Sequence, residues 1–219
     1  KINDFFIDTG LTRDEVLKHI EIGCPITRER SLIIMGDNVN CKSLDNRISV
    51  YILIEAIKKI KKPPFDFYAV FSVQEEVGIR GAQVAAHQIN PDFGLGIDTT
   101  IAYDVPGAKD EEMITKLGHG VAVKVMDSST ICDHRMVSFM KETALKNKIP
   151  YQLEVLTAGG TDTAGIQRMG KHGSIAGAIS IPTRHIHQVI EMVNKKDVTC
   201  AIDLLCNAVN KMNTYKWDH

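Results

Sequence analysis

Acidic and histidine side chains recur in this sequence directly after apolar segments or directly before helical ones. They are Asp45, the adjacent Glu75 and Glu76, Asp98, Asp162, and the pair His185 and His187. Ligands of open α/β sheets bind beyond the carboxyl ends of the strands, so we expect these side chains to converge on one edge of a sheet. Carboxylates and imidazoles suit zinc and similar divalent ions. The pattern therefore predicts a metal site.

Each part of this pattern also has a purely structural interpretation. Asp45 taken alone is more typical of a helix N-cap, and Asp98 of a turn that ends a strand. The Glu-Glu pair at 75–76 is equally compatible with solvated residues in the first turn of a helix, which the helix dipole favours. In the His-x-His segment 185–187, one metal ligand and one supporting contact is as good an interpretation as two ligands. The set is more informative than its members.

Two adjacent carboxylates can divide the work of metal-dependent hydrolysis. One binds a metal ion while its neighbour stays free as a general base for the attacking water. A separate carboxylate ahead of a helix, such as Asp45, could bridge two ions, and ions about 3.5–4 Å apart stabilise hydrolytic transition states. The glycine-rich segment 159–162 lacks the Gly-Lys-Ser/Thr ending of a phosphate-binding loop. The spacing thus favours a metal-dependent hydrolase.

Short apolar segments alternate with helical ones and must position these side chains. We expect strands at 31–35, 68–73, 93–97, 121–125, 151–156 and 174–181, and helices at 12–20, 45–61, 80–89, 133–146 and 198–212. The strands carry continuous rather than alternating apolar runs, which is typical of strands buried on both faces. We therefore predict an α/β fold with a mixed, mostly parallel sheet and helices on both faces.

The composition excludes several classes of protein. The chain has 219 residues, with 26 basic and 27 acidic side chains and a net charge of −1, so it has no basic surface for nucleic acid or an anionic membrane. It holds no run of 18 or more apolar residues that could span a membrane. Its five cysteines form no Cys-x-x-Cys pair, which favours reduced thiols. We predict a cytoplasmic protein without a signal peptide.

Five segments occur in an informative order. They are Leu44-Asp-Asn-Arg47, Phe71-Ser-Val-Gln-Glu-Glu-Val-Gly-Ile-Arg-Gly-Ala82, Gly96-Ile-Asp98 with Asp104-Val-Pro-Gly107, Gly159-Gly-Thr-Asp162, and Ile181-Pro-Thr-Arg-His-Ile-His187. Together they resemble the glutamyl aminopeptidase family, which includes the tetrahedral (TET) aminopeptidases and is often labelled cellulase-like. The resemblance covers residues 1–212. It implies the fold of zinc-dependent aminopeptidases and phosphorylases, and the removal of N-terminal residues from short peptides.

The resemblance also implies a role for individual residues. Two divalent ions, zinc or cobalt, would be held by a bridging Asp45, by Glu76 and His187 for one ion, and by Asp98 for the other. Glu75 would be the general base that activates the attacking water. The residues that would support the site or contact the substrate are Thr161, Asp162 and Arg184. The full-length protein is expected to be a homo-oligomer.

In one respect the sequence departs from the family pattern, because no His-x-Asp motif precedes Asp45. The resemblance therefore implies the C-terminal portion of such a protein. Residues 1–40 would be the end of an inserted β-rich dimerisation domain and the return to the catalytic domain, and residues 41–219 the catalytic domain without its first part. One alternative is an inactive metal-binding fragment or structural subunit that lacks one ligand. An endoglucanase ranks last, since it needs two carboxylates that flank a sugar and no metal.

Overall fold

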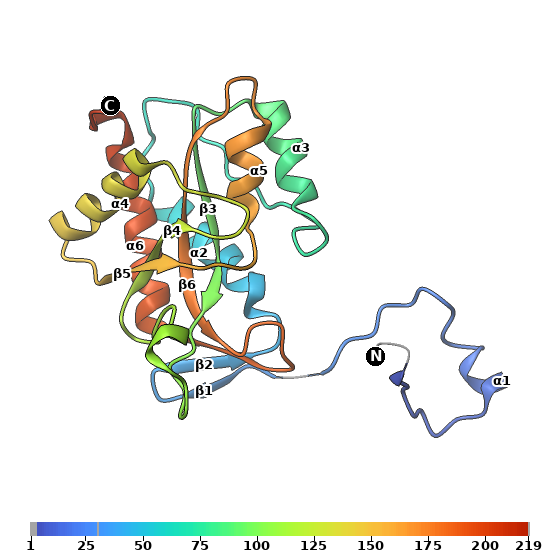
Figure 1. The fold of residues 1–219 in the computed structure, drawn as a ribbon. Coiled ribbons are helices and arrows are strands. Elements are labelled where there is room, and N and C mark those ends of the chain that lie inside the picture. The colour runs from blue at the N-terminus through green and yellow to red at the C-terminus, as the bar shows by residue number, and fades with distance from the viewer. Residues whose placement is uncertain (1–3, 30, 219) are drawn as a thin grey trace.

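A single sheet organises the fold in the computed structural model, which describes residues 4–29 and 31–218 (Figure 1). Its strands within these residues are β1 Ile33–Met35, β2 Asn38–Cys41, β3 Phe93–Ile101, β4 Val121–Met126, β5 Tyr151–Val155, β6 Ile175–Arg184 and β7 Glu191–Asn194. Their order in the sheet is β1–β2–β7–β6–β4–β5, and β3 pairs with β6 as well. The long strand β6 thus connects the two halves of the sheet.

Strand direction differs from the prediction. The pairings β3–β6 and β4–β5 are parallel, whereas the other four, β1–β2, β2–β7, β4–β6 and β6–β7, are antiparallel. The sheet is therefore mixed and mostly antiparallel, and the prediction of a mostly parallel sheet was wrong. The physical reason is that continuous apolar runs report burial on both faces, which does not fix the direction of a strand.

Helices cover both faces of the sheet, as predicted. On one face lie α2 (Leu44–Lys59), α4 (His134–Lys146) and α6 (Lys195–Lys211), and on the other lie α3 (Arg80–Ile89) and α5 (Asp162–Met169). Short 3-10 turns lie at Asp110–Glu112, between β3 and β4, and at Met212–Thr214, after α6. None of the helices in the described part of the chain has the length and apolar character needed to cross a bilayer.

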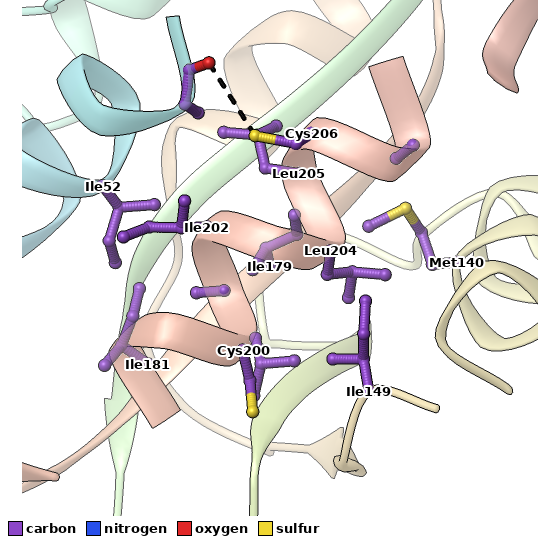
Figure 2. Close-up of a cluster of buried hydrophobic side chains, with 14 of the residues drawn as sticks. Ile52, Met140, Ile149, Ile179, Ile181, Cys200, Ile202, Leu204, Leu205 and Cys206 are labelled. Atoms are coloured by element: carbon purple, nitrogen blue, oxygen red, sulfur yellow. Dashed lines mark hydrogen bonds between the residues drawn. The ribbon is translucent and has the colours of Figure 1, made fainter. Parts of the chain in front are cut away.

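The hydrophobic core lies between α6 and the sheet. Figure 2 shows Leu204 and Ile202 of α6 beside Ile179 and Ile181 of β6, with Ile52 of α2 at one edge. These side chains are almost fully buried. Burying an Ile or Leu side chain contributes about 1.5–3 kcal/mol, so this cluster fixes α2 and β6 relative to each other. Both elements lead directly into segments with candidate site residues.

Two glycines of β3 allow α5 to approach the opposite face of the sheet. A Cβ atom at Gly96 would lie 2.1 Å from Thr163 Oγ1, and one at Gly94 would lie 2.2 Å from Ile166 Cγ2. Larger residues at these positions would push α5 away from β3. The close packing holds the first turn of α5, which begins at Asp162, against the strand that carries Asp98.

Several local predictions fail for physical reasons. Segment 68–73 forms no strand, because no strand among the described residues pairs with it. The helix expected at 12–20 is a single turn, α1 (Arg13–Val16), which buries no residue, and a short helix is unstable without packing. The elements β2, β7 and α5 were not predicted, and all three are short. The predicted division of the chain at residue 40 stays a prediction.

A buried ionic cluster joins β4 to β5. Lys124 Nζ lies 3.0 Å from Asp127 Oδ2 and 2.9 Å from Glu154 Oε1, and the Thr100 hydroxyl of β3 donates to Glu154 at 2.8 Å. Burial disfavours the charged amine, but the attraction of Glu154 and Asp127 outweighs it and raises the pKa of Lys124. The lysine therefore stays charged and compensates two buried carboxylates.

Replacing this lysine tests the cluster. Lys124→Met leaves Asp127 and Glu154 buried without a cation, so we expect the free energy of unfolding to fall by about 3–5 kcal/mol. The control Lys146→Met changes a lysine whose side chain is 74% exposed, and it should alter stability by less than about 0.5 kcal/mol. Urea unfolding measures both variants. Equal stability of the two would refute the role of the cluster.

Candidate metal centre

Three candidate ligands meet in space although they are far apart in the sequence. Asp45 lies at the start of α2, Glu76 in the turn before α3, and His187 in the turn after β6. His187 Nε2 lies 3.0 Å from Asp45 Oδ2 and 3.5 Å from Glu76 Oε2. One ligand atom from each residue lies within 4.8 Å of the other two. Asp45 is mostly buried, and the other two side chains face solvent.

Each of the three segments contains a non-glycine residue in the left-handed region. Ser43 has a φ of 53°, Gln74 of 60° and His187 of 62°. Such conformations cost of the order of 1–3 kcal/mol each and persist where the surrounding structure over-determines them. They are typical of functional sites. The backbone is thus bent at each point where a candidate ligand is presented.

Two further carboxylates lie beside this group. Asp98 is 7% exposed, and burial, followed by the charge of Asp45, raises its pKa well above the ordinary value. Burial and the neighbouring Glu76, Asp162 and Asp45 raise the pKa of Glu75 to about 7. Neither belongs to the three-residue group found among the described residues. Both nevertheless interact electrostatically with Asp45.

Asp162 is the first residue of α5 and carries another carboxyl group of the candidate site. The Ser72 hydroxyl donates a hydrogen bond to its Oδ2 atom. Its Oδ1 atom is buried and has no hydrogen-bond partner within the described residues. Burial raises the pKa of Asp162. The neighbouring Thr161 hydroxyl donates to Thr163 Oγ1 at 3.1 Å.

Arg184 is held by an ion pair at the end of β6. Its Nε and Nη2 atoms each lie 2.8 Å from one carboxylate oxygen of Asp104, and Nη2 also donates to the Asp104 carbonyl at 2.9 Å. This bidentate geometry fixes both groups. The structure therefore places Arg184 as an anchor for the turn that carries His187. Its predicted contact with substrate stays a prediction.

Glu191 is a site residue that the sequence interpretation missed. It begins β7, a four-residue strand that was not predicted. Its Oε2 atom accepts the backbone N–H of Asp45 at 2.8 Å, and its Oε1 atom accepts that of His187 at 2.9 Å. One feature of the sequence could have identified Glu191. It is a glutamate at the start of a short apolar segment, soon after the His-x-His motif.

The donor set fits a divalent cation. Two carboxylates and one imidazole converge. Burial and then the charge of Asp45 raise the pKa of Asp98, which places Asp98 near this group. Imidazole and carboxylate ligands are those of zinc and related ions. Five carboxylates (Asp45, Glu75, Glu76, Asp98 and Asp162) gather here around one histidine. A cation would remove the mutual repulsion that, together with burial, raises the pKa values of Glu75 and Asp98.

An α/β sheet with carboxylates and a histidine gathered on these loops forms a candidate metal site. Residues 1–204 match the model of the M42 glutamyl aminopeptidase family, and the chain belongs to that family. The resemblance in the five sequence motifs is thereby confirmed at the level of the family.

Three relatives illustrate the match. A protein of Acetivibrio thermocellus is 40% identical over 210 residues, which are 95% of this chain and 63% of that protein. The aminopeptidase structure from Desulfurococcus kamchatkensis is 36% identical with a TM-score of 0.86, covering 91% of this chain and 57% of the other. The TET1 peptidase of Pyrococcus horikoshii is 27% identical with a TM-score of 0.72, covering 90% and 57%. The chain thus spans about 60% of their length.

The ion pair of Asp104 gives a test of how the His187 turn is anchored. Burial opposes ionisation of Asp104, but hydrogen bonds and charge from Arg184 outweigh it and lower its pKa. We expect Asp104→Asn to reduce the free energy of unfolding by about 1–3 kcal/mol at pH 7.

The pH dependence of this loss follows from the sign of the shift. A lowered folded pKa stabilises the protein above the ordinary value of about 4, and this contribution disappears as the pH falls through the folded pKa. The difference between wild type and Asp104→Asn should therefore shrink in acid. Urea unfolding between about pH 3 and pH 7 measures it, and a difference independent of pH would contradict the assignment.

Proposed function

We propose that this chain forms the catalytic part of a metal-dependent aminopeptidase that removes N-terminal residues from short peptides. The observation that carries the proposal is the convergence of Asp45, Glu76 and His187 from three distant segments. Membership of the glutamyl aminopeptidase family supports the same reaction. The chain spans about 60% of the length of its relatives. The aminopeptidase activity of the whole protein is therefore also proposed here.

Two divalent ions, zinc or cobalt, are the proposed cofactors. Asp45, Glu76 and His187 would hold one ion, while Asp45 and Asp98 would contribute ligands to the other. When bound, such ions supply a Lewis acid that polarises the scissile carbonyl and lowers the pKa of water.

Glu75 is the proposed general base. It is adjacent to the ligand Glu76 in sequence but lies outside the ligand group, so its carboxylate is available for proton transfer. It would take a proton from water as the water oxygen bonds to the peptide carbonyl carbon. It would then deliver that proton to the amine nitrogen as the carbon–nitrogen bond breaks. Base and acid roles thus fall to one carboxyl group.

Substrate recognition would follow from charge and position. The excess of carboxylates favours the positively charged amino terminus of a peptide. Thr161 and Asp162, at the start of α5, are the proposed supporting residues, and the buried free oxygen Oδ1 of Asp162 is an acceptor at this edge. We further propose a cytoplasmic homo-oligomer. The assembly of the Pyrococcus horikoshii TET1 peptidase into a tetrahedron or an octahedral shell supports the oligomer.

The alternatives make different demands on the same residues. An inactive metal-binding fragment would bind the ion without turnover. An endoglucanase would need two carboxylates on opposite sides of a sugar. Glu75 and Glu76 are instead neighbours on one turn, and that reaction leaves His187 without a role.

The proposal is tested with an aminoacyl-nitroanilide substrate in the presence of zinc or cobalt. We expect turnover that a chelator abolishes and that the metal restores. Glu75→Gln removes the base but no ligand, so turnover should fall by about 10²–10⁴-fold while metal binding stays. The matched control is Glu111→Gln, because Glu111 is an exposed glutamate.

The outcomes separate the alternatives. Metal binding without turnover by the wild-type chain would favour the inactive fragment over the peptidase. Hydrolysis of a cellulose derivative in the presence of a chelator would favour the endoglucanase. Full activity of Glu75→Gln would refute its role as the base.

A further inference from the structure

One buried carboxylate connects two of the candidate metal ligands through their backbones. Glu191 is 2% exposed and accepts the N–H of Asp45 with one oxygen and the N–H of His187 with the other, at 2.8 and 2.9 Å. Asp45 and His187 are 142 positions apart in the chain, as the difference of their numbers shows. Glu191 therefore joins segments that no regular secondary structure connects at this point.

The sheet holds Glu191 itself in a defined place. It is the first residue of β7, where it lies opposite Cys41 of β2 in the antiparallel register. On its other side β7 pairs with the end of β6, through Met192 opposite Arg184 and Val193 opposite Thr183. Its backbone is thus flanked by strands, while its side chain extends to the two loops.

The two amides that it binds lie in irregular backbone. Asp45 departs from helical geometry, with a φ of −75° and a ψ of 106° at the start of α2. His187 has a φ of 62° in the turn after β6. Neither amide has the usual partner of a helix or a strand, and an unpaired buried amide costs about 1–3 kcal/mol. Glu191 satisfies both, which stabilises the two bends in the backbone.

The two oxygens of the Glu191 side chain distinguish it from a glutamine at this position. It is a sixth carboxyl group at this edge of the sheet. A carboxylate offers one oxygen to each amide, however, whereas glutamine offers one oxygen and a donor group. The double acceptor therefore requires an acid at this position.

We infer that Glu191 is a positioning residue that sets Asp45 and His187 relative to each other and so preorganises the cation site. The inference rests on the proposed metal site. It predicts that the geometry of the carboxylate matters as well as its charge, because both amides must be reached at once. Groups that orient metal ligands contribute about 10–100-fold to metal affinity.

Two variants and one control test the inference. Glu191→Gln presents a donor to one amide, and Glu191→Asp keeps the charge but is one methylene shorter. The control Glu111→Gln changes an exposed glutamate. Zinc and cobalt affinities are measured by competition with a chelator, and backbone hydrogen exchange is measured in metal-free protein over residues 43–47 and 185–189.

We expect both Glu191 variants to bind metal about 10–100-fold more weakly than wild type and to exchange faster in the two segments, while Glu111→Gln matches wild type. Wild-type affinity and exchange in Glu191→Asp would overturn the inference, since charge alone would then suffice. If Glu191→Gln does not fold, the metal affinity and hydrogen exchange of Glu191→Asp test the inference.

The two readouts also separate this inference from the proposed function. A wild-type chain that binds neither metal would overturn the proposed metal site. The exchange of the Asp45 and His187 amides would still report on Glu191 in that case, and unchanged exchange in the folded variants would overturn the positioning role.

Discussion

The burial of several carboxylates close together at one edge of the sheet is the constraint on which the candidate site depends. Burial, followed by neighbouring carboxylates, raises the pKa values of Asp45 and Asp98, and burial together with Glu76, Asp162 and Asp45 raises the pKa of Glu75 to about 7. One imidazole does not compensate five acids. A divalent cation bound here would supply the missing positive charge and would offset the cost of holding these carboxylates together.

Regular elements of the fold hold the segments that carry these side chains in fixed positions. The glycines of β3 allow α5 to pack against the strand that carries Asp98, and the core between α6 and β6 fixes the strand that leads to His187. Arg184 and Asp104 anchor that turn from one side, and Glu191 binds it to Asp45 from the other. The site residues come from irregular segments, but each segment is attached to a regular element.

The sequence predicted the residue types of the site and the α/β class, because strand-end carboxylates and buried apolar runs follow from local chemistry. It did not predict strand direction, since burial on both faces is common to parallel and antiparallel strands. The role of Glu191 depends on β7, a strand of four residues whose pairing with β2 joins positions far apart in the chain. Segment 68–73 shows the converse, because its apolar pattern favours a strand but none of the described strands pairs with it.

The proposed function depends on the binding of a divalent cation by Asp45, Glu76 and His187 together. Crystals of the zinc-loaded chain, with diffraction data collected on both sides of the zinc absorption edge, test it most directly. We expect an anomalous peak between the two carboxylates and His187 Nε2, within zinc–ligand distance of about 2.0–2.2 Å from each. A zinc peak elsewhere, with none among these three side chains, would contradict it.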